Sequence, residues 1–177
     1  MTREDAFYYE CLLAIGISDE YDEWLDSSLE SESPLSDITL DLVSCRSDVN
    51  KTISILYDYR MDQATDESGV CDRLRQFFQK AYHSNRMDKE KVVSFMYSLA
   101  SHVGDPGDFD LTIWGSIYYF DYYYALVNDG ILALEKVDSA FFAYLDDGVS
   151  LDPDKLWGTN KQMTFFERLK YWLSRNS

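Results

Sequence analysis

The stretch that decides the fold is WGSIYYFDYYYALVN, residues 114–128, with one tryptophan, one phenylalanine and five tyrosines in its first eleven residues. Wound as an α-helix, it places large side chains on almost every side, because positions recur about every 3.6 residues. A helix that is apolar all round is typical of the centre of a helical domain. Tyr, Phe and Ile also favour β-strands. We favour the helix for two reasons. The segment 110–128 is longer than a usual β-strand, and it ends at Asp129-Gly130, a pair of residues that commonly ends a helix.

The segments before this stretch also repeat apolar residues at helical spacing, and polar capping residues mark the helix starts. Thr2 and Asp5 form a capping-box pattern, and Ser33-Pro34 predicts a start with proline at the first helical position. The polar run 61–69 is predicted to be a loop. The other predicted starts are Ser18, Asp48 and Asp88; the expected apolar faces are Val49, Ile53, Leu56 and Tyr57 in one helix and Val70, Leu74, Phe77, Phe78, Ala81 and Tyr82 in the next.

Helical patterns continue after the aromatic stretch. Residues 131–145 predict a helix that is broken near Asp138-Ser139, and Pro153 predicts a short helical turn. A last helix is expected over residues 161–175. The sequence therefore predicts an all-α fold: a single helical domain over residues 1–177, with eight or nine helices packed compactly around the aromatic helix. We find no internal repeat that would indicate a solenoid.

The composition narrows the classes of partner. The chain has 177 residues, of which 16 are basic and 32 acidic, so its net charge is −16. Nucleic acids and anionic membranes repel a surface of this sign, so neither is expected as a partner. A cationic protein, a metal ion or no partner remains, and acidic charge also serves solubility alone.

The cysteines and the N-terminus bear on location. Cys11, Cys45 and Cys71 are odd in number, far apart and surrounded by apolar residues, which is typical of reduced, buried thiols. The first residues, MTREDAFYYE, lack the pattern of a signal peptide, and no apolar run is long enough to span a membrane. We expect a cytoplasmic protein.

Negative charge is concentrated near the N-terminus. Residues 4–45 contain no lysine or arginine, whereas residues 73–91 are rich in both. One interpretation is that the basic helices pack near the acidic ones and neutralise them. The alternative is a carboxylate surface that binds a basic partner, with Tyr21 or Trp24 as an aromatic anchor. The predicted partner-binding residues are Asp19, Glu20, Tyr21, Asp22, Glu23, Trp24, Asp26 and Glu30.

No catalytic, cofactor-binding or metal-binding motif is found. His83 and His102 lack the neighbours of a transition-metal site, and no cysteine has a nucleophile signature. There is no phosphate-binding glycine loop, so no cofactor is expected. Two carboxylate-rich loops do not match the calcium-binding pattern and are interpreted as turns. Their acidic residues are Asp105, Asp108 and Asp110 in the first loop and Asp146, Asp147, Asp152 and Asp154 in the second.

Three hypotheses about function follow. The first is a non-enzymatic interaction protein that binds a basic partner through acidic helices, in its sharpest form an inhibitor such as an immunity protein against a nuclease toxin. The second is a helical scaffold or adaptor with mainly hydrophobic contacts, which exposed apolar residues on two neighbouring helices would favour. The third is an enzyme built on carboxylates, which requires buried acids in a deep pocket and a carboxylate of raised pKa.

Overall fold

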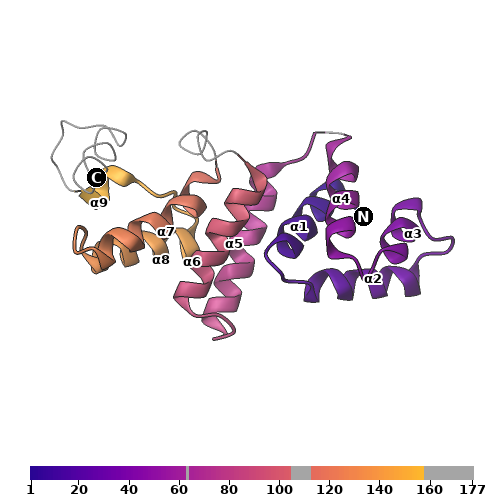
Figure 1. The fold of residues 1–177 in the computed structure, drawn as a ribbon, viewed down its shortest axis with the longest axis horizontal. Coiled ribbons are helices and arrows are strands. Elements are labelled where there is room, and N and C mark those ends of the chain that lie inside the picture. The colour runs from indigo at the N-terminus through magenta and orange to yellow at the C-terminus, as the bar shows by residue number, and fades with distance from the viewer. Residues whose placement is uncertain (63, 105–112, 158–177) are drawn as a thin grey trace.

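All the secondary structure that the computed structural model describes, over residues 1–62, 64–104 and 113–157, is α-helical (Figure 1). This confirms the all-α prediction. The helices in these ranges are α1 (Arg3–Ala14), α2 (Asp19–Ser31), α3 (Asp37–Ser44), α4 (Val49–Met61), α5 (Glu67–His83), α6 (Lys89–Val103), α7 (Gly115–Asn128), α8 (Leu134–Asp147) and α9 (Pro153–Trp157). The predicted last helix over residues 161–175 and the loop that holds Asp105, Asp108 and Asp110 lie outside the described residues.

The helices form an elongated arrangement with the N-terminal helices at one end (Figure 1). There, α1 to α4 lie together, α5 and α6 occupy the middle, and α7 to α9 form the other end. Helix α1 packs against α2, α4, α5 and α6, whereas the main contacts of α3 in the described residues are with α2 and α4. The aromatic helix α7 packs against α6 and α8. Both α1 and α7 are therefore central helices, each packed against more than one neighbour.

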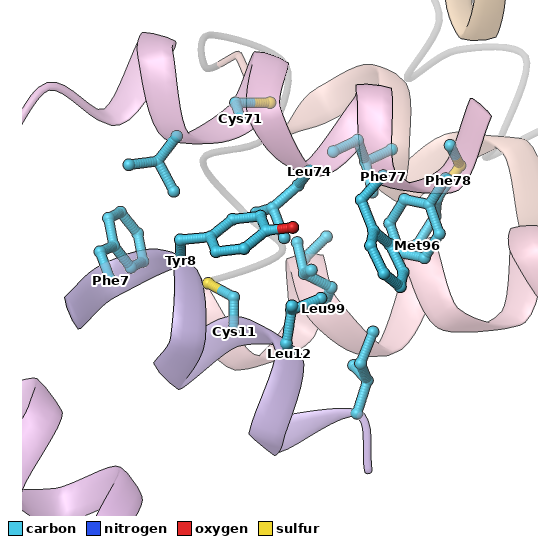
Figure 2. Packing of buried hydrophobic residues seen from close by; sticks show 14 of the residues in the cluster. Phe7, Tyr8, Cys11, Leu12, Cys71, Leu74, Phe77, Phe78, Met96 and Leu99 are labelled. Carbon is cyan, nitrogen blue, oxygen red and sulfur yellow. The ribbon is translucent and has the colours of Figure 1, made fainter. Parts of the chain in front are cut away.

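A continuous apolar core joins these helices. Figure 2 shows Phe7, Tyr8, Cys11 and Leu12 of α1 facing apolar side chains of α5 and α6. On α7 the fully buried positions are Ile117, Phe120, Tyr123 and Leu126, which recur at helical spacing, while most of the other tyrosines are partly exposed. One face of the aromatic helix is thus in the core, and the tyrosine hydroxyls on its other faces reach the edge.

The predicted caps explain several helix boundaries. The Thr2–Asp5 capping box is present, with the Asp5 amide donating to the Thr2 hydroxyl at 3.0 Å. Asp48 and Asp88 each accept a hydrogen bond from a backbone amide in the first turn of their helices. Helix α8 ends at Gly148, whose φ of +70° lies in the left-handed region that favours glycine. The Arg75 guanidinium also packs against this glycine, so a side chain here would meet it.

The prediction of a helix start at Ser33-Pro34 is wrong, because α3 begins at Asp37 with Ser36 as its N-cap. The carboxylate of Glu32, just after α2, accepts hydrogen bonds from the Ser36 amide at 3.1 Å and from the Thr39 hydroxyl at 3.0 Å. These bonds also lower the pKa of Glu32. The side chain that ends one helix therefore fixes where the next one begins.

The predicted break at Asp138-Ser139 is also wrong, because α8 runs unbroken from Leu134 to Asp147. The Asp138 carboxylate accepts hydrogen bonds from the Lys89 ammonium and from the Tyr124 hydroxyl, both at 2.7 Å. It therefore has partners on α6 and α7 and does not compete for the local backbone as a cap would.

Two smaller corrections concern α4 and the segment after it. Of the predicted apolar face, Leu56 is buried, but Val49 and Tyr57 are exposed. The other buried residue of α4 is Thr52, whose hydroxyl donates to the Asp48 carbonyl at 3.0 Å, so its polar atom is satisfied although it is buried. The loop predicted over residues 61–69 is shorter, because α4 extends to Met61 and Asp66 caps α5.

Candidate functional site

The N-terminal third carries most of the net charge. Residues 1–62 contain fifteen acidic and four basic side chains, which is eleven of the sixteen net negative charges of the chain. Two of the four basic residues, Arg3 and Arg60, are largely buried, and each forms an ion pair with an acidic residue of the fold. The surface of α2 to α4 is therefore the strongest candidate for a charged functional site.

Most of the predicted partner-binding residues on α2 do reach the surface. Asp19, Glu23, Asp26 and Glu30 are exposed, while Glu20, Asp22 and Trp24 are partly buried. Tyr21 is only 3% exposed and belongs to the core. The Trp24 ring lies 5.7 Å from Tyr9 and 6.2 Å from Tyr21, so it covers this core and shows one part to solvent. Of the two predicted anchors, Trp24 is the one that a partner could touch.

Three of the α2 carboxylates have partners within the fold. The Arg46 guanidinium makes a bidentate pair with Asp26, at 2.5 and 2.9 Å, and lies 3.8 Å from Asp22. Its hydrogen bonds lower the pKa of Asp26. Glu20 accepts a hydrogen bond of 2.8 Å from the Tyr8 hydroxyl, and burial together with this carboxylate raises the pKa of Tyr8. In the described part of the chain, Asp19, Glu23 and Glu30 have neither an ion pair nor a side-chain hydrogen bond.

The proposed neutralisation by basic helices occurs at α1 and not at the exposed face of α2. Arg73 of α5 pairs with Asp5 at 2.8 Å and stacks over the Tyr8 ring at 3.7 Å. Burial opposes ionisation of Asp5, but the bonds from Arg73 and Thr2 lower its pKa. Arg73 thus neutralises Asp5 on α1, whereas Arg86 and Lys91 line a pocket with Asp19 and Glu20 of α2 but form no ion pair with them in the described residues.

A groove between α3 and α4 adds a feature that the sequence analysis missed. It encloses about 570 Å³ and is lined by Asp37, Asp41, Asp58 and Asp62, with Ile38, Ile55, Tyr59 and Ser36 between them. Asp37 and Asp41, and likewise Asp58 and Asp62, are four residues apart and so lie on one face of their helix. This spacing was visible in the sequence, but the apposition of the two helices was not.

Among the described residues, one carboxylate is buried, that of Glu10, and its contacts hold helices together. Glu10 on α1 is 1% exposed and accepts hydrogen bonds from Arg60 of α4 at 2.5 Å, while His102 of α6 lies 2.9 Å away. The Arg60 guanidinium also stacks over the Phe7 ring at 3.9 Å. A single carboxylate shared by an arginine and a histidine joins three helices. It is not the pair of acids in a deep pocket that the carboxylate-enzyme hypothesis requires.

The described residues also bear on metal binding and on the reactivity of the cysteine thiols. Among the residues described, no group of three or more His, Cys, Asp or Glu side chains is placed to hold a metal ion. The three cysteines are buried and free, and burial raises the pKa of the Cys71 thiol to about 11. A thiol of this pKa is protonated and unreactive at neutral pH. In the part of the chain that is described, no helix is both long and apolar enough to cross a membrane.

No protein family, curated protein or solved structure matches this chain. Its function is therefore inferred from its own residues. The features available are the unpaired carboxylates of α2, the acidic groove between α3 and α4, and the apolar side chains exposed near both.

Proposed function

We propose that this protein is a non-enzymatic interaction protein that binds a basic protein through the carboxylates of α2, α3 and α4. The observation that carries the proposal is the concentration of unpaired acidic charge on α2 to α4. Residues 1–62 carry eleven of the sixteen net negative charges, and several of their exposed acids have no ion pair in the described residues: Asp19, Glu23, Glu30, Asp37, Asp41 and Asp58. In its sharpest form the protein is an inhibitor, of the kind that an immunity protein is for a nuclease toxin.

The physical basis is electrostatic steering. A nuclease or another nucleic-acid-binding protein presents basic residues to phosphate groups. Exposed carboxylates can occupy the same sites, and complementary fields raise the association rate well above that of a neutral pair. Trp24, partly exposed among these acids, offers the aromatic contact that such interfaces favour.

A second function, a scaffold with hydrophobic contacts, is favoured by a separate observation. Leu29 on α2 and Leu40 and Val43 on α3 are exposed, Leu40 at 49%, and these two helices pack against each other. Apolar side chains exposed on neighbouring helices suit a partner that binds by burial of surface and not by charge. Salt separates the two functions, because it screens exposed charges and leaves hydrophobic contacts intact.

The test is capture of partners from a lysate of the source cell at low and moderate salt. Three forms are compared: the wild type, a variant with Asp19→Lys, Glu23→Lys and Glu30→Lys, and a matched control with Asp121→Lys, Asp129→Lys and Asp147→Lys. Both variants change the net charge equally, and all six positions are exposed. We expect one basic protein in equal amount to the bait, lost with salt and with the α2 variant but retained by the control.

The inhibitor hypothesis is then tested with the purified partner. The association rate should fall by about tenfold or more in the α2 variant, because steering acts on the rate of encounter. If the partner is a nuclease, the wild type should inhibit it in a stoichiometric complex. Capture that is insensitive to both salt and charge reversal would favour the scaffold instead.

A further inference from the structure

Both walls of the α3–α4 groove carry negative charges. Each wall has two aspartates one helical turn apart, Asp37 and Asp41 on α3 and Asp58 and Asp62 on α4. Like charges at this spacing destabilise a helix. In the described residues, Asp37, Asp41 and Asp58 have no ion pair or side-chain hydrogen bond, and only Asp62 has a cation, Arg3, at 3.7 Å. The groove therefore concentrates negative charge that the fold itself does not neutralise.

The floor of the groove is apolar. Ile38 of α3 and Ile55 of α4 are partly buried and pack on the hydrophobic core, and Tyr59 lies beside them. An apolar side chain placed on this floor would remove apolar surface from water, which is favourable. A free metal ion or a hydrated cation makes no such contact. The occupant should combine positive charge with an apolar residue.

The chain already shows how a guanidinium fits one wall. Arg3 lies with its guanidinium carbon 3.6 Å from the centroid of the Tyr59 ring, while one of its nitrogens approaches the Asp62 carboxylate. The Tyr59 hydroxyl donates to the Met1 carbonyl at 3.0 Å and so holds the ring in place. Arg3 already occupies this face of the ring, so the preference for arginine over lysine in an incoming partner rests on the carboxylates, with which a planar guanidinium forms paired hydrogen bonds.

We propose that the α3–α4 groove binds one amphipathic helix of the basic partner, with arginines one turn apart on either side of an apolar side chain. The arginines pair with the aspartates of the two walls, whose one-turn spacing they match, and the apolar side chain contacts Ile38 and Ile55. The proposal rests on the proposed function and assigns a site and a binding mode to it. It belongs to the class of helix-in-groove recognition.

The probe is a fluorescent, alanine-based helical peptide of about fifteen residues, long enough to hold some helix in water. Two pairs of arginines, spaced four residues apart, flank a stripe of leucines. One control peptide has the same composition in scrambled order, and another replaces each arginine with lysine. Binding to the full chain is followed by fluorescence anisotropy at physiological ionic strength. The patterned arginine peptide should bind on the order of tenfold more tightly than the scrambled one, since only it presents charge and leucine on one face.

Two neutral variants locate the site. Asp41→Asn with Asp58→Asn removes one charge from each wall, and Glu23→Gln with Glu30→Gln removes two from α2 as the matched control. An exposed ion pair is worth up to roughly a factor of five, so the groove variant should bind the peptide about tenfold more weakly and the α2 control within about twofold of wild type. Circular dichroism confirms that both variants are folded.

Several results would overturn the assignment. Equal binding of the patterned and scrambled peptides, equal losses in the two variants, or no binding of either peptide would each remove the groove as a helix site. If the captured natural partner binds the groove variant as well as wild type but not the α2 reversal variant, the groove assignment fails and the proposed function stands. Self-association that Asp41→Asn with Asp58→Asn abolishes would assign the groove to a second copy of this chain, whose residues 161–175 are basic.

Discussion

The contact between α3 and α4 and the contact between α5 and α8 use charge in opposite ways. Between α5 and α8, charged side chains hold the helices together: Arg75 of α5 donates to the carbonyl of Leu145 at 2.6 Å, and His83 contacts Asp146 at 2.7 Å. Between α3 and α4, the carboxylates of Asp37, Asp41 and Asp58 line a groove and contact no cation in the described residues. These three carboxylates therefore do not hold the two helices together, and they are the basis of the proposed binding of a basic partner.

The same contrast holds for apolar packing. In the C-terminal half, Phe141 of α8 is fully buried, with its ring 5.4 Å from Phe120 and 6.1 Å from Tyr124. Helix α3 has one fully buried apolar side chain, Leu42, and its main contacts in the described residues are with α2 and α4. Helix α8 therefore buries more side chains than α3, and α3 carries the repulsion between Asp37 and Asp41 with fewer buried contacts to offset it.

The largest expected effect tests this difference in packing. Phe141→Ala should lower the free energy of unfolding by about 3–5 kcal/mol, because it removes a ring from a tightly packed aromatic cluster. Leu42→Ala, at an equally buried position, should cost nearer to ~2 kcal/mol, because a short helix at the end of the molecule can close around the smaller side chain. Urea unfolding monitored by circular dichroism gives both values. Equal losses would show that the two regions are packed alike.

A smaller effect concerns pH. Burial opposes ionisation of Asp138, but the hydrogen bonds from Lys89 and Tyr124 outweigh it and lower its pKa below the usual 3.8. A lowered pKa contributes stability that is present above about pH 4 and is lost as the pH falls through the folded-state value. Asp138→Asn should therefore cost under about 1 kcal/mol near neutral pH, since the pair is partly exposed, and should flatten the acid side of the stability profile.

The control for this prediction is Asp129→Asn, an exposed acid in the same half without an ion pair in the described residues. It should change the unfolding free energy little at any pH between about 3 and 7, because its carboxylate has no ion pair in the described residues whose loss would destabilise the fold. An identical response of the two variants would mean that the Lys89–Asp138–Tyr124 cluster does not hold α8 to its neighbours.

The smallest effect has the opposite sign. Asp41→Asn with Asp58→Asn should leave the stability unchanged or raise it by about 0.2–0.5 kcal/mol, because each change relieves repulsion between carboxylates one turn apart. Thermal unfolding at low salt is the measurement, since screening removes the gain. A loss of more than about 1 kcal/mol would show that these carboxylates have a structural role.

Local sequence signals predicted the helices well, and contacts between helices account for the errors. The capping box at Thr2 and the Asp88 cap depend on residues three positions away, and both are present. The expected break at Asp138 followed from the same local logic, but its carboxylate bonds to residues from two other helices. When the partner of a side chain lies far away in the sequence, the residues next to that side chain do not reveal the partner.

The candidate site shows the same limit. The absence of basic residues from 4 to 45 identified the acidic end of the molecule, and most of the α2 acids are exposed as expected. The sequence left two positions open for Tyr21, the core or an interface, because a tyrosine on an amphipathic surface helix suits either, and the structure places it in the core. The groove depends on how α3 lies against α4, which neither helix encodes alone.

The position of Met1 has a practical consequence for anyone who handles this protein. Its carbonyl is bonded to Tyr59, and Arg3 stacks on the same ring, so a purification tag or fluorescent fusion joined to Met1 would emerge next to the α3–α4 groove. Helix α9 lies at the opposite end of the molecule (Figure 1). Attachment to a sensor surface on that side would leave the acidic helices facing solution, whereas attachment through the first residue would crowd them.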